Sequence, residues 1–204
     1  MNCICIRKAQ HFLGAFALFG CSYGRLVTVA RIVVELALQS LPWSVAAGDL
    51  ALHRHDLTPS EVVDVVAELG RRTGIARARQ LAPHLDARSE SVAESLSRVH
   101  LAEAGIPSPE PQLWVGNDHR PIARIDFAWT KYRVAGECDG IGKYFDSAGG
   151  GPQAALRREK RRDGDLIDLG WTPVHWTYSE ILNGAMARRV AHTLVRNGWD
   201  GRRT

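Results

Sequence analysis

The spacing of hydrophobic residues first changes close to Gly105 and Pro107 in this chain of 204 residues. Before that point, hydrophobic residues recur every three or four positions, which is the period of an amphipathic helix. After it, residues 112–115 and 121–129 read as strands, because hydrophobic and polar side chains alternate in the longer of the two segments. The change of period predicts a helical region followed by an α/β domain.

The helical region is expected to cover residues 25–86. Its expected helices span residues 25–41, 44–53, 59–69 and 75–85. The first is expected to stop at Leu41–Pro42, because proline removes a backbone donor. The third has the clearest start, with Thr58 as N-cap, Pro59 at the first helical position and Glu61 three residues after the cap.

The second part of the chain, residues 87–197, is expected to be an α/β sandwich built on a central mixed sheet. Its expected elements are a helix over 91–104, strands over 112–115, 121–129 and 133–138, a helix over 152–169, a strand over 171–178 and a helix over 179–196. Residues 1–24 are expected to be a tail of doubtful order, and 198–204 a second tail.

Composition is that of a globular protein, with 45% hydrophobic and 24% charged residues. The net charge of +4 is compatible with a phosphate-bearing partner without requiring one. The cysteines form no CxxC pair, so neither a zinc site nor a disulfide framework is predicted, and a reducing cytoplasm is expected. Arg7 and Lys8 precede a short hydrophobic run with the outline of a secretory signal, but the run is too short to cross a membrane. We therefore expect no membrane partner.

Two of the expected strands bring a pair of acidic residues together. One face of the strand over 121–129 is expected to carry Ile125, Phe127 and Trp129. Asp126 is then predicted on the opposite face. A two-residue turn at Lys131–Tyr132 would set Asp126 directly opposite Glu137 in the neighbouring strand, and residues paired in this way point to the same side.

Two carboxylates held this close repel each other unless a cation lies between them. Oxygen ligands of this kind suit Mg²⁺, which binds one or two carboxylates and keeps waters for substrate phosphates. The alternative is a solvated sheet face on which the acids pair across strands with Arg124 and Arg133. The spacing alone leaves both interpretations open.

The residues around this pair resemble a known family. The run Arg124-Ile-Asp126-Phe-Ala-Trp, followed by Glu137-Cys-Asp139-Gly140 and Lys143-Tyr144, is similar to the core of the very-short-patch-repair-endonuclease-like domains of the PD-(D/E)XK nuclease superfamily. Glu94 and the segment from Glu159 to Gly170 match two helices of that family, and the resemblance covers residues 25–197. Similar actinobacterial proteins carry the domain behind a winged helix and are described as type IV antitoxin-like. No winged helix is recognisable here, which suggests an N-terminally truncated chain.

The resemblance implies a restriction-endonuclease-like sandwich that hydrolyses DNA phosphodiester bonds with a metal ion. Asp126 and Glu137 are then expected to bind Mg²⁺ or Mn²⁺. Asp139 stands where the family usually has a lysine, and Lys143 is expected to supply the positive charge instead. Glu94 is expected to orient a metal-bound water or Lys143. The alternative is that Glu94 forms an ordinary ion pair with Arg98, four residues later in the same helix.

The helix over 152–169 carries a basic cluster, in which Lys160, Arg161 and Arg162 are expected to contact DNA phosphates. The alternative is a solvated helix face with local pairing to Glu159 and Asp163. The second functional hypothesis is a non-catalytic, antitoxin-like regulator that keeps the nuclease fold to bind nucleic acid, with a toxin or another protein as its partner. A third is a remnant that has lost its function.

Overall fold

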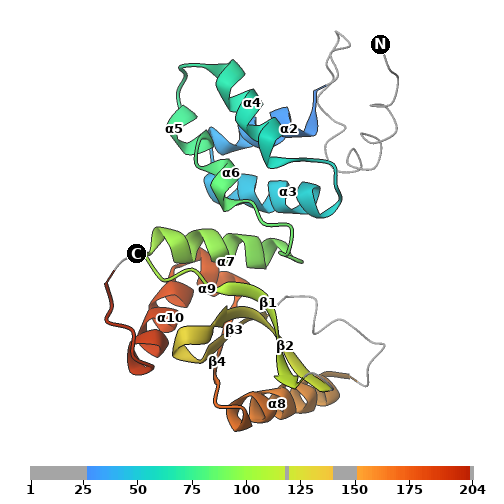
Figure 1. Cartoon of the computed structure of the whole chain (residues 1–204), viewed down its shortest axis with the longest axis vertical. Coiled ribbons are helices and arrows are strands. Elements are labelled where there is room, and N and C mark those ends of the chain that lie inside the picture. The colour runs from blue at the N-terminus through green and yellow to red at the C-terminus, as the bar shows by residue number, and fades with distance from the viewer. Residues whose placement is uncertain (1–26, 118–119, 140–150, 203–204) are drawn as a thin grey trace. The chain divides into compact units, whose positions relative to one another are not determined.

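The computed structural model describes residues 27–117, 120–139 and 151–202. It divides the chain into two compact units, residues 1–87 and 88–204. Both are drawn in Figure 1, which shows helices alone in the first unit and a sheet with helices in the second. Within the described residues, no helix has the length and hydrophobicity needed to cross a membrane.

The first unit is helical, as the sequence predicts. Its helices are α2 (Val29–Ala37), α3 (Leu41–His53), α4 (Pro59–Leu69), α5 (Ile75–Ala78) and α6 (Leu81–His84). The capping box of Thr58 and Glu61 at the start of α4 is confirmed. The predicted stop at Leu41–Pro42 is wrong, because Pro42 lies in the first turn of α3, where a backbone donor has no partner inside the helix. The expected helix over 75–85 is two short helices.

The second unit is built on a mixed sheet, which confirms the α/β class. Its strands are β1 (Glu110–Asn117), β2 (Arg120–Trp129), β3 (Val134–Asp139) and β4 (Thr172–Thr177), in the order β1-β2-β3-β4. The first two pairings are antiparallel, and β3 pairs with β4 in parallel. The connection between β2 and β3 is a short 3-10 turn over Thr130–Tyr132 followed by Arg133 in the left-handed conformation.

Helices cover both faces of the sheet (Figure 1). One face is covered by α7 (Val92–Glu103), α9 (Tyr178–Leu182) and α10 (Ala185–Arg196), and the other by α8 (Gly151–Asp168). The last helix predicted from the sequence is two helices, because Gly184 takes a φ of 74° between them. The second of these, α10, ends at Arg196, as expected.

Two hydrophobic clusters mark the two faces. The cluster on the side of α7 and α10 includes Leu96, Phe127, Trp129, Cys138, Trp176 and Val190. The cluster on the side of α8 includes Ala123, Ile125, Ala128, Ala135, Leu166 and Trp171. Membership in one cluster or the other therefore shows toward which helices a strand residue points.

The alternation of β2 changes phase at Asp126, which corrects the prediction that Ile125 and Phe127 share a face. Ile125 packs on the α8 side, whereas Phe127 packs on the α7 side. In β1, Gln112 falls opposite Asp126, between the pairs formed by its neighbours, and takes a φ of 57°. A left-handed residue other than glycine in a strand is strained, and such strain often accompanies functional sites.

The segment after α10 is another correction, because residues 198–204 were expected to be a tail. Gly198 has a φ of 96°, and the amide of Trp199 donates to the carbonyl of Leu194 at 2.9 Å. This turn brings Trp199, which is 8% exposed, into the α7-side cluster. Tryptophan buries a large hydrophobic area, so this part of the expected tail belongs to the core.

Gly136 in β3 leads to a prediction about stability. A Cβ at Gly136 would lie 2.7 Å from Trp176 and 2.9 Å from Trp129. Both rings are buried and tied by hydrogen bonds from their indole nitrogens. We expect Gly136→Ala to lower the free energy of unfolding by about 1–3 kcal/mol in urea titrations.

Gly164 provides the matched control, because a Cβ there would have no atom within 4 Å. Gly164→Ala should raise the free energy of unfolding by about 0.5–1 kcal/mol, since alanine favours a helix. Equal effects of the two substitutions would contradict the close packing of Gly136.

Candidate functional site

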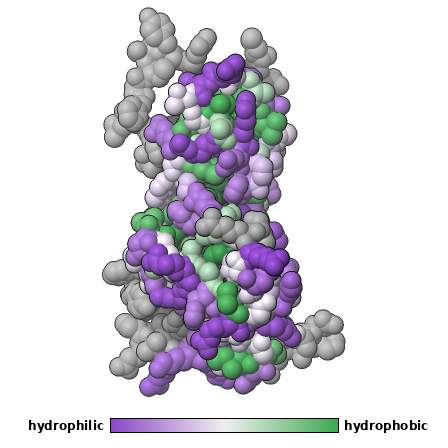
Figure 2. Space-filling model, turned by 90° about the vertical axis from the view of Figure 1, so that its left-hand side faces the viewer, coloured by the Kyte–Doolittle hydropathy of each residue, from purple (hydrophilic) through white to green (hydrophobic). Residues whose placement is uncertain are grey.

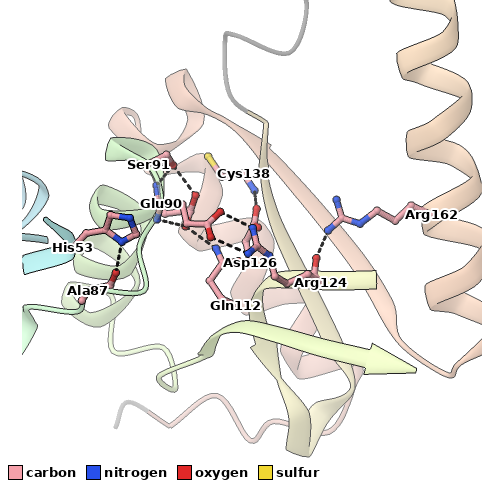
Figure 3. A network of polar contacts seen from close by, with 10 residues as sticks. His53, Ala87, Glu90, Ser91, Gln112, Arg124, Asp126, Cys138 and Arg162 are labelled. Atoms are coloured by element: carbon pink, nitrogen blue, oxygen red, sulfur yellow. Dashed lines mark hydrogen bonds and ion pairs between the residues drawn. The ribbon is translucent and has the colours of Figure 1, made fainter. Parts of the chain in front are cut away.

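Asp126 lies where β2 and β3 begin to separate. The last ladder pair between the strands is Phe127 with Gly136, so the register sets Asp126 opposite Glu137, as predicted. The carboxylate of Asp126 accepts a hydrogen bond from the amide nitrogen of Cys138 at 3.4 Å (Figure 3). Since that nitrogen belongs to the peptide between Glu137 and Cys138, the Asp126 carboxylate lies beside the backbone of the second predicted metal ligand.

Glu94, at the start of α7, is held by three hydrogen bonds. Its carboxylate accepts from the hydroxyl of Ser91 at 2.8 Å, from the amide of Glu90 at 3.0 Å and from the side-chain amide of Gln112 at 2.8 Å. Gln112 thereby connects β1 to α7 across from Asp126. These contacts support a structural role for Glu94, in capping α7 and anchoring Gln112.

Burial and negative charge raise two pKa values around Asp126. The pKa of Glu94 is raised, mainly by burial and further by the charge of Asp126. The pKa of the Cys138 thiol is raised to about 12, mainly by burial and further by the charges of Asp126, Glu94 and Asp139. The charges of three predicted catalytic acids, Asp126, Glu94 and Asp139, therefore affect the same group, the Cys138 thiol on the α7 side of β3.

Arg124 is the positive group beside these acids. Its guanidinium donates two hydrogen bonds to the carboxylate of Glu90, one of them at 2.8 Å (Figure 3). The same guanidinium lies 5.7 Å from the ring centre of Trp114, its partner across the β1–β2 ladder. Arg124 thus pairs with Glu90, which precedes α7. The alternative interpretation of the sequence paired Arg124 with the acidic residues of the strands, and the described contact is a different one.

Glu137 has its described contacts on the α8 side. The side chain is 2% exposed, and its carboxylate forms an ion pair with the guanidinium of Arg162 at 2.6 Å. The ring of His175 lies 4.0 Å from the other carboxylate oxygen and contacts Asp163 at 3.0 Å. Arg162 also donates to the backbone carbonyl of Arg124 (Figure 3), so one guanidinium joins α8 to β2 and β3.

The described contacts of the two predicted metal ligands lie with different helices. The register is the predicted one, but Asp126 acts on Glu94 and Cys138 while Glu137 contacts Arg162. The change of phase in β2 is the physical reason, because it turns the Asp126 side chain toward α7. Among the described residues, no group of three or more histidine, cysteine or acidic side chains is arranged to hold a metal ion.

The other predicted site residues are placed as follows. Asp139 is the last residue of β3 and pairs with Thr177 in the ladder with β4. Lys143 lies outside the described residues. Lys160 and Arg161 are exposed on α8, whereas Arg162, predicted to contact DNA, is instead engaged by Glu137 and the backbone of Arg124.

Sequence reasoning missed several partners that complete these networks. Gln112 lies opposite Asp126 because the register of β1 and β2 shifts by one residue between Val115 and Gly116, and the turn residues alone do not indicate that shift. The pairs Arg124–Glu90 and Arg162–Glu137 join residues far apart in the chain. No spacing in the sequence indicates such pairs, because they depend on how the helices pack on the sheet.

Comparisons with known proteins identify relatives without assigning a function. Two uncharacterized proteins of Mycobacterium tuberculosis, from strains CDC 1551 / Oshkosh and ATCC 25618 / H37Rv, are each 37% identical to this chain over 177 residues. The matched part is 85% of this chain and 63% of each relative, so the chain spans less than two thirds of their length. No family model matches the chain, and no solved structure matches it.

The buried ion pair of Glu137 and Arg162 predicts strong coupling between the two residues. Removing one partner of a buried pair leaves an uncompensated charge, which is more costly than removing both. We expect Arg162→Met to lower the free energy of unfolding by about 2–4 kcal/mol, a range that allows for the partial exposure of Arg162. The double variant with Glu137→Gln should recover part of that loss.

The neighbouring Arg161 serves as control, because it is exposed. Arg161→Met should change the free energy of unfolding by less than about 0.5 kcal/mol. Strictly additive effects of Arg162→Met and Glu137→Gln in urea titrations would contradict the pairing.

The raised pKa of Glu94 predicts a pH dependence of stability. An acid with a raised pKa binds a proton more tightly in the folded state, so its contribution is present below the ordinary value of 4.5 and is lost as pH rises through the folded pKa. The free energy of unfolding of the wild type, relative to Glu94→Gln, should therefore fall as pH rises above 4.5.

Glu180 provides a control of opposite sign. Its pKa is lowered, mainly by the hydrogen bond from the Thr177 amide, so its contribution is present above 4.5 and lost in acid. Relative to Glu180→Gln, the free energy of unfolding should rise as pH rises. Parallel curves for both variants between pH 3 and 7 would contradict these shifts.

Proposed function

We propose that the α/β unit is a nucleic-acid-binding domain with a restriction-endonuclease-like fold. The mixed sheet between helical layers supports this fold, as do the adjacent strands that carry Asp126 and Glu137. On α8, Arg157, Lys160 and Arg161 are exposed, and Arg157 precedes the other two by three and four residues, so its side chain lies beside each of theirs on the helix surface. Such a surface attracts phosphates whatever the base sequence.

One observation favours binding over hydrolysis, namely the ion pair between Glu137 and Arg162. The carboxylate that was expected to hold a metal ion already has a positive partner from the protein itself, at 2.6 Å. A metal ion would have to displace that guanidinium from a residue that is 2% exposed. Asp126 has its described contact with the Cys138 amide and Glu137 with Arg162, which supports binding without hydrolysis.

A non-catalytic binder of this kind matches the antitoxin-like regulator that the resemblance suggests. Such a regulator keeps the fold and its basic surface while the acidic residues serve stability. A toxin or another protein as partner, and a cytoplasmic location, belong to this same proposal.

Hydrolysis of phosphodiester bonds is the second candidate, and one observation favours it. The charge of Asp126 raises the pKa of Glu94, so two carboxylates share one neighbourhood. Carboxylate oxygens are the ligands that Mg²⁺ prefers, and a bound ion of this type lowers the pKa of its water.

The first proposal predicts salt-dependent binding through α8. Fluorescence anisotropy of labelled 20-nucleotide DNA, single-stranded and duplex, should show affinity falling steeply between 50 and 200 mM salt. The double variant Lys160→Gln, Arg161→Gln removes two phosphate contacts. The slope of log K against log salt should become shallower by about 1.4 to 1.8.

Arg188 and Arg196 on α10 are also exposed, so the double variant Arg188→Gln, Arg196→Gln is matched in charge. It should leave the slope close to that of the wild type. An equal change of slope in both double variants, or DNA binding that does not depend on salt, would overturn the proposed α8 surface.

Incubation of plasmid DNA with the full chain and Mg²⁺ or Mn²⁺ separates the two candidates. The binding proposal predicts intact plasmid. Cleavage that is lost in Asp126→Asn and retained in Asp56→Asn, in the other unit, would favour hydrolysis instead.

A further inference from the structure

Trp114 in β1 is the most exposed large hydrophobic side chain among the described residues, at 61%. A tryptophan ring exposed to this extent loses the favourable burial that usually retains it. Figure 2 shows one face of the molecule, where hydrophobic side chains form small patches among hydrophilic ones. The exposed area of one ring is far smaller than a stable protein interface buries.

The ring of Trp114 is held in place from one direction. The guanidinium of Arg124 lies 5.7 Å from the ring centre, and Glu90 fixes that guanidinium with two hydrogen bonds. Trp114 and Arg124 are direct partners in the β1–β2 ladder, so the strand register sets their spacing. The ring is therefore an ordered flat surface on a rigid pair of strands.

The surroundings of the ring suit an unpaired base. Ile122, two residues before Arg124 in β2, is 41% exposed and extends the same side of the strand pair. Gln112 and Asp126 lie opposite each other two positions further along the same strands. Arg162 on α8 donates to the backbone carbonyl of Arg124, so β2, the strand that carries Arg124, is fixed from the other face of the sheet.

We propose that Trp114, supported by Arg124, is a stacking platform for an unpaired nucleobase of single-stranded nucleic acid. The inference rests on the proposed nucleic-acid binding and adds a preference for single strands. Bases stack on aromatic side chains through their flat faces, and this contact tolerates any base sequence. Val115, Ala123 and Ile125 pack on the α8 side, so Trp114 and Arg124 face the α7 side, and the platform is a contact separate from the α8 surface.

The test compares four fluorescently labelled probes of 12 nucleotides in EDTA: single-stranded DNA, single-stranded RNA, a blunt duplex and an abasic strand that keeps the phosphates without the bases. The wild type should bind either single strand more tightly than the abasic strand or the duplex. Trp114→Ala should weaken binding of the single strands by about 5- to 150-fold and leave the abasic strand unchanged. Trp114→Phe should retain most of the affinity.

Trp43 in α3, which is 45% exposed, is the matched control, and Trp43→Ala should bind as the wild type does. Unchanged single-strand affinity in Trp114→Ala would overturn the platform while leaving the α8 surface intact. Failure of all probes to bind would overturn the proposed function itself. Sedimentation that shows a dimer lost in Trp114→Ala would assign the ring to a contact between copies instead.

Discussion

The buried carboxylate of Glu137 is the constraint on which the α/β unit depends. A charge that is 2% exposed must have a partner, and α8 supplies one through Arg162. The same guanidinium donates to the carbonyl of Arg124, so α8 is tied to both central strands. The position of α8 on the sheet and the ion pair of Glu137 therefore depend on the same residue, Arg162.

The side chains of β2 do not alternate regularly around Asp126. Ile125 packs under α8 and Phe127 packs under α7, so the side chain between them leaves the regular alternation. Asp126 consequently reaches the amide of Cys138 and acts on Glu94 rather than completing a pair with Glu137. The strain of Gln112, which lies opposite, belongs to the same irregularity.

The sequence predicted the elements well where their signals are local. The capping box at Thr58 and the register that sets Asp126 opposite Glu137 both depend on residues near each other in the chain. The errors arose where packing overrides a local pattern. Trp199 lies in a segment that the sequence predicts to be a tail, yet it belongs to the core, because removing its large hydrophobic side chain from water is favourable.

The helical unit, the mixed α/β unit and the strands that carry the acidic residues can all be predicted from the amino-acid sequence. These follow from hydrophobic period and capping, which act over a few residues. The pairing of Glu137 with Arg162, the contact of Asp126 with the Cys138 amide and the exposure of Trp114 become visible once the helices are packed on the sheet. Those outcomes depend on contacts between distant segments, whose energies no local spacing encodes.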